Sequence, residues 1–232
     1  MRNKIINIDC REFELPDDCL IISDPPYNIN YKYLEYSDSM TEEEYMDLFK
    51  IFKGKKCVFI HYPEETIKYI IPSMGVPTEI VSWVYNSMNK RQHRMISWYN
   101  CKPDFSKVKQ PYKNITDKRI IERINNGHKG ADIYDWWDID LVKNVSKEKT
   151  EYTNQIPEEI INRIIKTTAT YELILDPFNG SGTTCAVAQK LGFDWLGLDV
   201  SKAAIDIANK RMKPLLNELF NEKNKQETSN PK

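Results

Sequence analysis

Residues Ile174–Thr184 read ILDPFNGSGTT, and this stretch decides the expected fold. Apolar residues lead to Asp176, and the chain then turns through Gly180 and Gly182 before a helical pattern begins near Thr183. Glycine lets the backbone turn tightly and approach a ligand with no Cβ in the way. The stretch lacks the third glycine of a dinucleotide cradle and the GK[ST] ending of a P-loop. On its own, this strand–turn–helix pattern is weak evidence for a bound cofactor.

A second element strengthens that evidence. Asp199 closes the next predicted strand, 17 residues after Gly182. An acid at this place can accept hydrogen bonds from both ribose hydroxyls of a nucleoside. The alternative is that Asp199 is an acid at a helix N-terminus, with Ser201 close by. Taken alone, the residue favours this second interpretation.

A third element is the motif SDPPYN at residues 23–28, where another predicted strand ends. Pro25 and Pro26 remove two amide donors and stiffen the turn, so that the Asp24 carboxylate and the Pro25 carbonyl can point at one spot. Two acceptors that converge on an NH2 group suit methylation of an exocyclic amine, because they hold both hydrogens and move the lone pair toward the methyl group. Tyr27 offers a flat face on which an extruded base can stack. As a bare turn, Asp-Pro-Pro can also be structural.

Outside these motifs, predicted strands and helices alternate through most of the chain, which indicates an open α/β sheet. A capping box of Thr41 and Glu44 predicts a helix that Gly54 ends. Residues 79–85 and 95–99 are predicted to form an antiparallel pair. Further strands are expected at 4–8, 19–23, 56–60, 172–176 and 194–200, and further helices at 158–168, 183–191 and 202–212.

The net charge of −1 hides an uneven distribution. Residues 86–130 carry eleven basic and three acidic side chains, whereas residues 1–85 carry nine basic and fifteen acidic ones. A basic segment between acidic flanks is a candidate footprint for a polyanion. A solvated face of lysines would give the same count, so the charge alone leaves the choice open.

Composition limits the remaining classes of function. With 232 residues, of which 41% are hydrophobic, the chain can bury one good core and carry a small insert. It contains no run of eighteen apolar residues, and its first ten residues are too polar for a signal peptide, so no membrane partner and a cytoplasmic location are expected. Five scattered cysteines are expected to be reduced thiols, and together with three scattered histidines they predict no metal site.

Taken together, the two motifs resemble those of the S-adenosylmethionine-dependent DNA amino-methyltransferases, and specifically of their permuted β group. In that group DPPY comes first, a target-recognition insert follows, and FxGxG lies near the C-terminus. The order here is the same. Three other stretches resemble family segments: NIDC at 7–10, IVSWVYN followed by RQHRMISW, and IYDWWDI followed by YTNQIPEEIINRII. The resemblance covers nearly the whole chain except the insert and the tail.

The resemblance implies an α/β fold with a Rossmann-like methyltransferase sheet of seven strands, mostly parallel with one antiparallel strand, in circularly permuted motif order. It implies a catalytic half over 1–100, a small target-recognition insert over 101–150 and a cofactor-binding half over 151–215. A flexible tail is expected over 216–232.

The same resemblance implies the functional residues. The catalytic set is Asp24, Pro25, Pro26 and Tyr27. The set for S-adenosylmethionine is Asp9, Cys10, Asn154, Gln155, Asp176, Pro177, Phe178, Asn179, Gly180, Ser181, Gly182, Thr183 and Asp199. The charge of segment 86–130, and not the resemblance, gives the candidate DNA contacts, which are Lys90, Arg91, Arg94, Lys107 and Lys109. The chain departs from the family where Gln-Lys-Pro is replaced by Gln155-Ile156-Pro157. Without the lysine, any cofactor contact from this segment falls to Asn154 and Gln155.

The expected activity is site-specific transfer of a methyl group to N6 of a flipped-out adenine in double-stranded DNA. Methylation of cytosine N4 is the nearest alternative, because both bases carry an amine beside a ring nitrogen. Methylation of RNA or of a protein glutamine, a nicotinamide-dependent oxidoreductase and a catalytically inactive DNA-binding relative are weaker alternatives. A homodimer and a partner restriction nuclease are further expectations about assembly.

Overall fold

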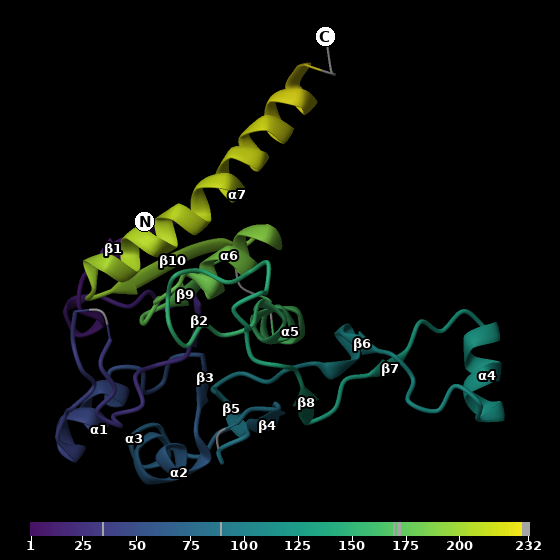
Figure 1. The fold of residues 1–232 in the computed structure, drawn as a ribbon, viewed down its shortest axis with the longest axis horizontal. Coiled ribbons are helices and arrows are strands. Elements are labelled where there is room, and N and C mark those ends of the chain that lie inside the picture. The colour runs from purple at the N-terminus through teal and green to yellow at the C-terminus, as the bar shows by residue number, and fades with distance from the viewer. Residues whose placement is uncertain (34, 89, 169, 171–172, 229–232) are drawn as a thin grey trace.

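The structure is a computed structural model that describes the chain except residues 34, 89, 169, 171–172 and 229–232, and it leaves the side chains of 218–228 undescribed. A central sheet organises the molecule (Figure 1), and its strands run in the order β1-β10-β9-β2-β3-β5-β4-β8. The strands are β1 Lys4–Asn7, β2 Leu20–Ser23, β3 Cys57–His61, β4 Glu79–Val84, β5 His93–Tyr99, β8 Trp136–Asp138, β9 Leu173–Asp176 and β10 Asp194–Asp199.

The sheet is mostly parallel, as expected. Strand β5 pairs antiparallel with both β3 and β4, and the other pairings are parallel. The number of strands differs from the expected seven, because the described residues contribute eight to this sheet. The additional strand is the short β8, which pairs with β4 and buries Trp137 against Trp98. Three residues are too few to give a recognisable alternation in the sequence.

Helices cover both faces of the sheet. Alternate residues of each central strand point to opposite sides, so both faces carry apolar side chains that the helices bury. On one face, α5 (Glu158–Thr168), α6 (Thr183–Lys190) and α7 (Lys202–Thr228) pack against side chains that include Leu20 and Ile22. On the other, α1 (Glu42–Lys50) and the helical stretch of α2 (Pro63–Glu65) to α3 (Ile71–Met74) pack against Ile21 and its neighbours. The predicted capping box at the start of α1 is confirmed.

The C-terminal segment contains more helix than the sequence predicts. The sequence predicts a flexible tail over 216–232, but α7 continues as a helix to Thr228 (Figure 1), and residues 229–232 lie outside the described part of the chain. The segment after Pro214 contains no glycine or further proline before Pro231, and its Leu, Glu, Lys and Gln residues are good helix formers. Its polar composition therefore indicates an exposed helix as readily as an irregular tail.

The part of the basic segment that follows β5 forms an arm, which extends from the end of the sheet (Figure 1). Strands β6 (Lys109–Gln110) and β7 (Ala131–Asp132) pair antiparallel at its base, and α4 (Lys118–Asn125) lies at its end. No side chain of α4 is buried in the described structure. Across the described residues, none of the helices combines the length and the apolar character that a membrane span requires.

Candidate active site

The topology brings the two motifs together. Strands β2 and β9 are parallel neighbours, with Leu20 opposite Ile174, so the segments that follow their carboxyl ends lie at the same edge of the sheet. This edge is where open α/β sheets place ligands. The Ser23 hydroxyl donates a hydrogen bond of 2.5 Å to Oδ1 of Asp176 and ties the two strand ends to each other.

Asp24 lies at the centre of this edge with two partners. The Tyr27 hydroxyl donates to its Oδ1, and Nη1 of Arg94 lies 3.6 Å from its Oδ2. The Asp24 side chain is 22% exposed. Burial raises the pKa of Asp24 to about 6, while the charge of Arg94 and the Tyr27 hydrogen bond act in the opposite direction. The carboxyl group is therefore mostly ionised at pH 7, because its pKa lies below that pH by only about one unit.

The turn after Asp24 is held by buried hydrogen bonds. The Tyr45 hydroxyl donates to the Pro26 carbonyl at 2.6 Å, and it lies 2.6 Å from Nε2 of His61. Because one hydroxyl donates once, Nε2 of His61 must carry the hydrogen of that second bond. Burial lowers the pKa of His61 to about 3, so this histidine stays neutral and acts as a fixed donor. The Tyr27 amide donates to Oδ2 of Asp38 at 3.2 Å.

The ring of Tyr27 is covered, which differs from the open stacking face expected from the sequence. Only 7% of Tyr27 is exposed. Its ring centroid lies 4.2 Å from that of His61 and 4.8 Å from that of Tyr62, and the guanidinium of Arg94 lies 5.2 Å away. Stacking of a base on Tyr27 stays a prediction, and it requires some of these side chains to move.

The glycine turn has the conformation that its sequence predicts. Gly180 and Gly182 have φ values of 46° and 74°, in the left-handed region that favours glycine. A Cβ at Gly180 would lie 3.1 Å from the ring of Tyr152, so the glycine also allows close packing. Within the turn, Nδ2 of Asn179 is buried and has no hydrogen-bond partner among the described residues. An unpaired buried donor is costly, which makes it a candidate ligand contact.

Asp199 has the helix-start role that the sequence left open, and its contact with ribose hydroxyls stays a prediction. Its Oδ2 accepts from the Gly180 amide at 2.7 Å, and its Oδ1 accepts from the Ser201 amide at 2.8 Å, just before α7 begins. Burial raises the pKa of Asp199, and these amide bonds oppose that effect. A carboxylate has about four lone-pair sites. The group therefore fixes the glycine turn to the start of α7 and keeps acceptor capacity for a ligand.

Two cavities adjoin this edge, and Phe178 lines both. The larger, of about 400 Å³, is lined by the predicted residues Asp9, Cys10, Pro177, Phe178 and Asp199, together with Tyr36. The smaller, of about 60 Å³, extends from Asp24 to the glycine turn, and its predicted lining residues are Asn154, Gln155, Asp176, Phe178, Asn179, Gly180, Ser181 and Thr183. Of the predicted cofactor set, Gly182 alone lines neither cavity; it caps the start of α6.

Sequence reasoning missed several residues of these cavities. Tyr33 and Tyr152 line the smaller cavity and Tyr36 lines the larger one. Glu35 ties the loop that carries Tyr33 and Tyr36 to the start of α7, because its carboxylate accepts from the Ser201 hydroxyl at 2.8 Å. Tyrosines without a fixed spacing carry no sequence signal for a site.

The predicted residues Asp9 and Gln155 are largely engaged by the protein itself. The Arg11 guanidinium donates to Asp9, and that hydrogen bond lowers the pKa of Asp9 against the opposing effect of burial. The Gln155 side chain accepts from the Thr150 amide at 2.9 Å and donates to the Glu148 carbonyl at 2.7 Å. Gln155 therefore shapes the loop before α5, and any contact with a cofactor would be additional.

The predicted DNA contacts do not form one group. Lys90, Lys107 and Lys109 are exposed, although Lys109 pairs with Asp132 across the base of the arm. Arg91 forms an ion pair with Glu65 at 3.2 Å. The DNA contact of Arg94 stays a prediction, and in the free protein this residue is 8% exposed with its Nη1 3.6 Å from Asp24. Net charge along the sequence does not distinguish a buried cation from a surface one.

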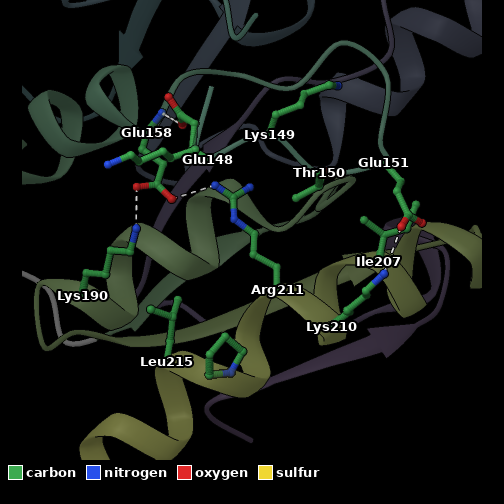
Figure 2. Close-up of a pocket in the computed structure, with 12 residues that line it drawn as sticks. Glu148, Lys149, Thr150, Glu151, Glu158, Lys190, Ile207, Lys210, Arg211 and Leu215 are labelled. Atoms are coloured by element: carbon green, nitrogen blue, oxygen red, sulfur yellow. Dashed lines mark hydrogen bonds and ion pairs between the residues drawn. The ribbon is translucent and has the colours of Figure 1, made fainter. Parts of the chain in front are cut away.

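A further cavity of about 680 Å³ lies behind the glycine turn, between residues 147–151 and α7 (Figure 2). Figure 2 shows Lys190 and Arg211 converging on Glu158, with N–O distances of 2.5 and 2.7 Å. Arg211 also donates to the Thr183 hydroxyl at 2.8 Å. These contacts support the turn from behind. No cluster of three or more potential metal ligands occurs in the part of the chain that the structure describes.

Comparison with known proteins agrees with this geometry. Residues 19–210 match the model of the N6/N4 DNA methylase family. The type II methyltransferase M.BglII of Bacillus subtilis is 27% identical over 247 residues, which span 89% of this chain and 68% of that protein.

Two solved structures are similar to the whole fold. The complex of M1.HpyAVI with S-adenosylmethionine has a TM-score of 0.57 and 20% identity, covering 90% of this chain and 98% of that one. The cytosine-N4-specific PvuII DNA methyltransferase has a TM-score of 0.58 and 16% identity, covering 91% and 88%. These likenesses establish a Rossmann-like α/β fold.

Proposed function

The chain belongs to the N6/N4 DNA methylase family, and we propose on that premise that it transfers a methyl group from S-adenosylmethionine to N6 of adenine in DNA. The observation that carries this proposal is the position of Asp24, which follows β2 directly beside the glycine turn that follows β9. We further propose that the chain has the permuted β-group order, because the DPPY motif precedes the FxGxG motif in the sequence.

The described residues fit the cofactor. When bound, S-adenosylmethionine supplies an electrophilic methyl group. The larger cavity would hold its nucleoside end, where Asp199 retains acceptor capacity for ribose hydroxyls. The smaller cavity, which continues past Phe178 to Asp24, would hold the amino-acid end. The unpaired Nδ2 of Asn179 supports this assignment, because a carboxylate there would satisfy it.

Asp24 and the Pro25 carbonyl are the proposed acceptors for the two hydrogens of the target amine. The Pro26 carbonyl already accepts from Tyr45, which supports assigning the role to Pro25. With a pKa of about 6, Asp24 is mostly ionised at pH 7 and can accept a hydrogen bond. After methyl transfer, the surplus proton on the amine leaves to Asp24 or to water.

The choice of adenine rests on the motif. Within the family that the sequence resembles, Asp at the first position of DPPY goes with adenine more often than with cytosine, whose enzymes commonly carry Ser there. Cytosine N4 is the second candidate, and the fold does not separate the two, since the PvuII enzyme is cytosine-specific. A homodimer and a partner nuclease remain predictions.

Replacing Asp24 by Ala tests the proposal. The variant should lose methyl transfer by at least about 10²–10³-fold, the usual effect of removing one positioned contact of this kind. Binding of S-adenosylmethionine, measured by calorimetry, should stay near wild type, because Asp24 faces the amine. Asp18→Ala is the matched control, since this exposed carboxylate precedes the same strand. An Asp24→Ala rate above a tenth of wild type would contradict the assigned role.

A further inference from the structure

Arg94 occupies a surrounding that the proposed function does not explain. It lies on β5, opposite Trp83 of β4. Four aromatic rings, which we call the aromatic cage (Tyr27, Tyr62, Trp83 and Tyr85), surround its guanidinium at 5.2, 5.5, 5.2 and 6.0 Å. A guanidinium ion is attracted to the faces of such rings, especially when it is desolvated. The cage therefore fixes one buried positive charge at the end of β5.

The carboxylate that faces this charge is Asp24, with 3.6 Å between Nη1 and Oδ2. That distance is too long for a hydrogen bond but short enough for strong charge interaction at a buried site. Both Nε and Nη1 of Arg94 are buried without a hydrogen-bond partner among the described residues. Burying a cation with unpaired donors is costly, so the arrangement is unfavourable for stability alone.

The other groups around Asp24 do not supply a positive charge. From the same turn, Tyr27 donates a hydrogen bond to it. Tyr33, Tyr45 and Tyr152 approach from other segments as neutral phenols, and the charge of Asp24 raises the pKa of each in addition to the larger effect of burial. Arg94 is the cation that affects the ionisation of Asp24 within the described structure.

We propose that Arg94 is a positioning residue of the methyl transfer, whose caged charge keeps Asp24 in the carboxylate form and oriented toward the target amine. This role rests on the proposed function of Asp24 as an acceptor for that amine. The Tyr27 hydroxyl is the present hydrogen-bond donor to Asp24, and stacking of a base would draw Tyr27 away. The unpaired Nε and Nη1 of Arg94 then provide a second donor close to the carboxylate.

The short distance between Arg94 and Asp24 sets the expected change in the pKa of Asp24 when the guanidinium is removed. Burial already raises the pKa of Asp24 to about 6 with Arg94 in place. An opposite charge at this range typically lowers the pKa of a carboxyl group by about 1–3 units. Without the guanidinium, Asp24 would titrate near or above pH 7. A shift of about 2 units would leave roughly one tenth of Asp24 ionised at pH 7.

The test is the pH dependence of the single-turnover methylation rate at saturating DNA and S-adenosylmethionine, for wild type, Arg94→Met and Arg94→Lys. The wild-type rate should fall below about pH 6. For Arg94→Met the fall should begin about 1–3 pH units higher, with about tenfold loss at pH 7 that recovers in alkaline buffer. Arg94→Lys keeps the charge and should stay near the wild-type profile. Arg163→Met is the matched control, because Arg163 also lies against a tryptophan ring but on α5.

An unshifted profile for Arg94→Met would overturn this role. So would an equal loss at every pH together with a raised KM for DNA, since that pattern would make Arg94 a DNA contact. If Arg94→Met fails to bind S-adenosylmethionine or to melt cooperatively, Arg94→Gln takes its place with the same expected shift. An inactive wild type would contradict the proposed function itself, whereas an active wild type with an unshifted variant would contradict only the role of Arg94.

Discussion

At the scale of single residues, Asp199 shows how a carboxylate that holds the backbone can also be oriented for a proposed ligand. Its oxygens hold the amides of Gly180 and Ser201, which join the glycine turn to the start of α7. A ligand hydroxyl in the larger cavity would find this carboxylate already oriented. Preorganisation of this kind lowers the cost of binding, because the protein group does not have to be ordered by the ligand.

Asp199→Ala should weaken binding of S-adenosylmethionine by about 10- to 100-fold, since charge-assisted hydrogen bonds contribute about 1.5–3 kcal/mol. Calorimetric titration of the cofactor measures this directly, and the affinity for DNA should change much less. Asp206→Ala on the exposed side of α7 is the control. An unchanged cofactor affinity would show that Asp199 accepts hydrogen bonds from backbone amides and does not contact the cofactor.

The sequence predicts residues best where the chemistry needs a fixed local pattern. Asp24 and the glycines of the turn belong to short motifs, and the structure brings them to one edge. The basic stretch around Arg94 predicts a DNA contact, whereas the burial of this residue in the aromatic cage depends on the pairing of β4 with β5. Tyr33, Tyr36 and Tyr152 reach the cavities through loop conformations that no local pattern encodes.

At the scale of elements, the sequence predicts long periodic segments correctly and short or polar ones poorly. Helix α1 has its capping box, and the antiparallel pairing of β4 and β5 is as expected. Strand β8 is defined by its partner β4, because three residues carry no period of their own. The extension of α7 to Thr228 is also absent from the expectations, since a polar helix outside the core lacks an apolar stripe.

The arm formed by β6, α4 and β7 should supply much of the DNA affinity by binding phosphate groups. Its basic side chains are exposed, as is Lys90 at the turn between β4 and β5. Changing the exposed arm residues Lys118, Arg123 and Lys129 to Gln should lower the slope of log affinity against log salt by about 0.9 for each phosphate that is no longer neutralised. Filter binding or fluorescence anisotropy at several salt concentrations measures the slope.

Changing Lys50 and Lys53 to Gln provides the control for the arm, because these lysines lie at the end of α1 on the other side of the sheet. That pair should leave the slope unchanged. A wild-type slope for the triple variant would place the DNA elsewhere on the molecule.

At the scale of the whole molecule, the proposed methyl transfer at the edge of the sheet requires the target base to leave the duplex. A stacked base cannot present its amine beside Asp24, and extruding it costs a few kcal/mol. Stacking of the base on Tyr27, worth about 1–3 kcal/mol per base, can offset part of the free-energy cost of extrusion. Because Tyr27 is covered in the free protein, opening of its contacts with Arg94 and His61 adds to the cost of flipping.

A mismatch opposite the target adenine should therefore tighten binding, because less pairing has to be broken. Equilibrium binding to two otherwise identical duplexes, paired and mismatched at the target, measures the difference. The same mismatch placed outside the recognition site should have no such effect. Equal affinities for the two duplexes would indicate that base extrusion does not contribute to the binding equilibrium.

The most direct test of the proposed function is the identity of the methylated nucleoside. DNA incubated with the protein and S-adenosylmethionine carrying a labelled methyl group is digested to nucleosides, which are separated by chromatography and identified by mass spectrometry. Label in N6-methyladenine at a fixed short sequence is the predicted result, and Asp24→Ala should remove it. Label in N4-methylcytosine would contradict the base assignment, and absence of label from both would contradict the proposed methyl transfer.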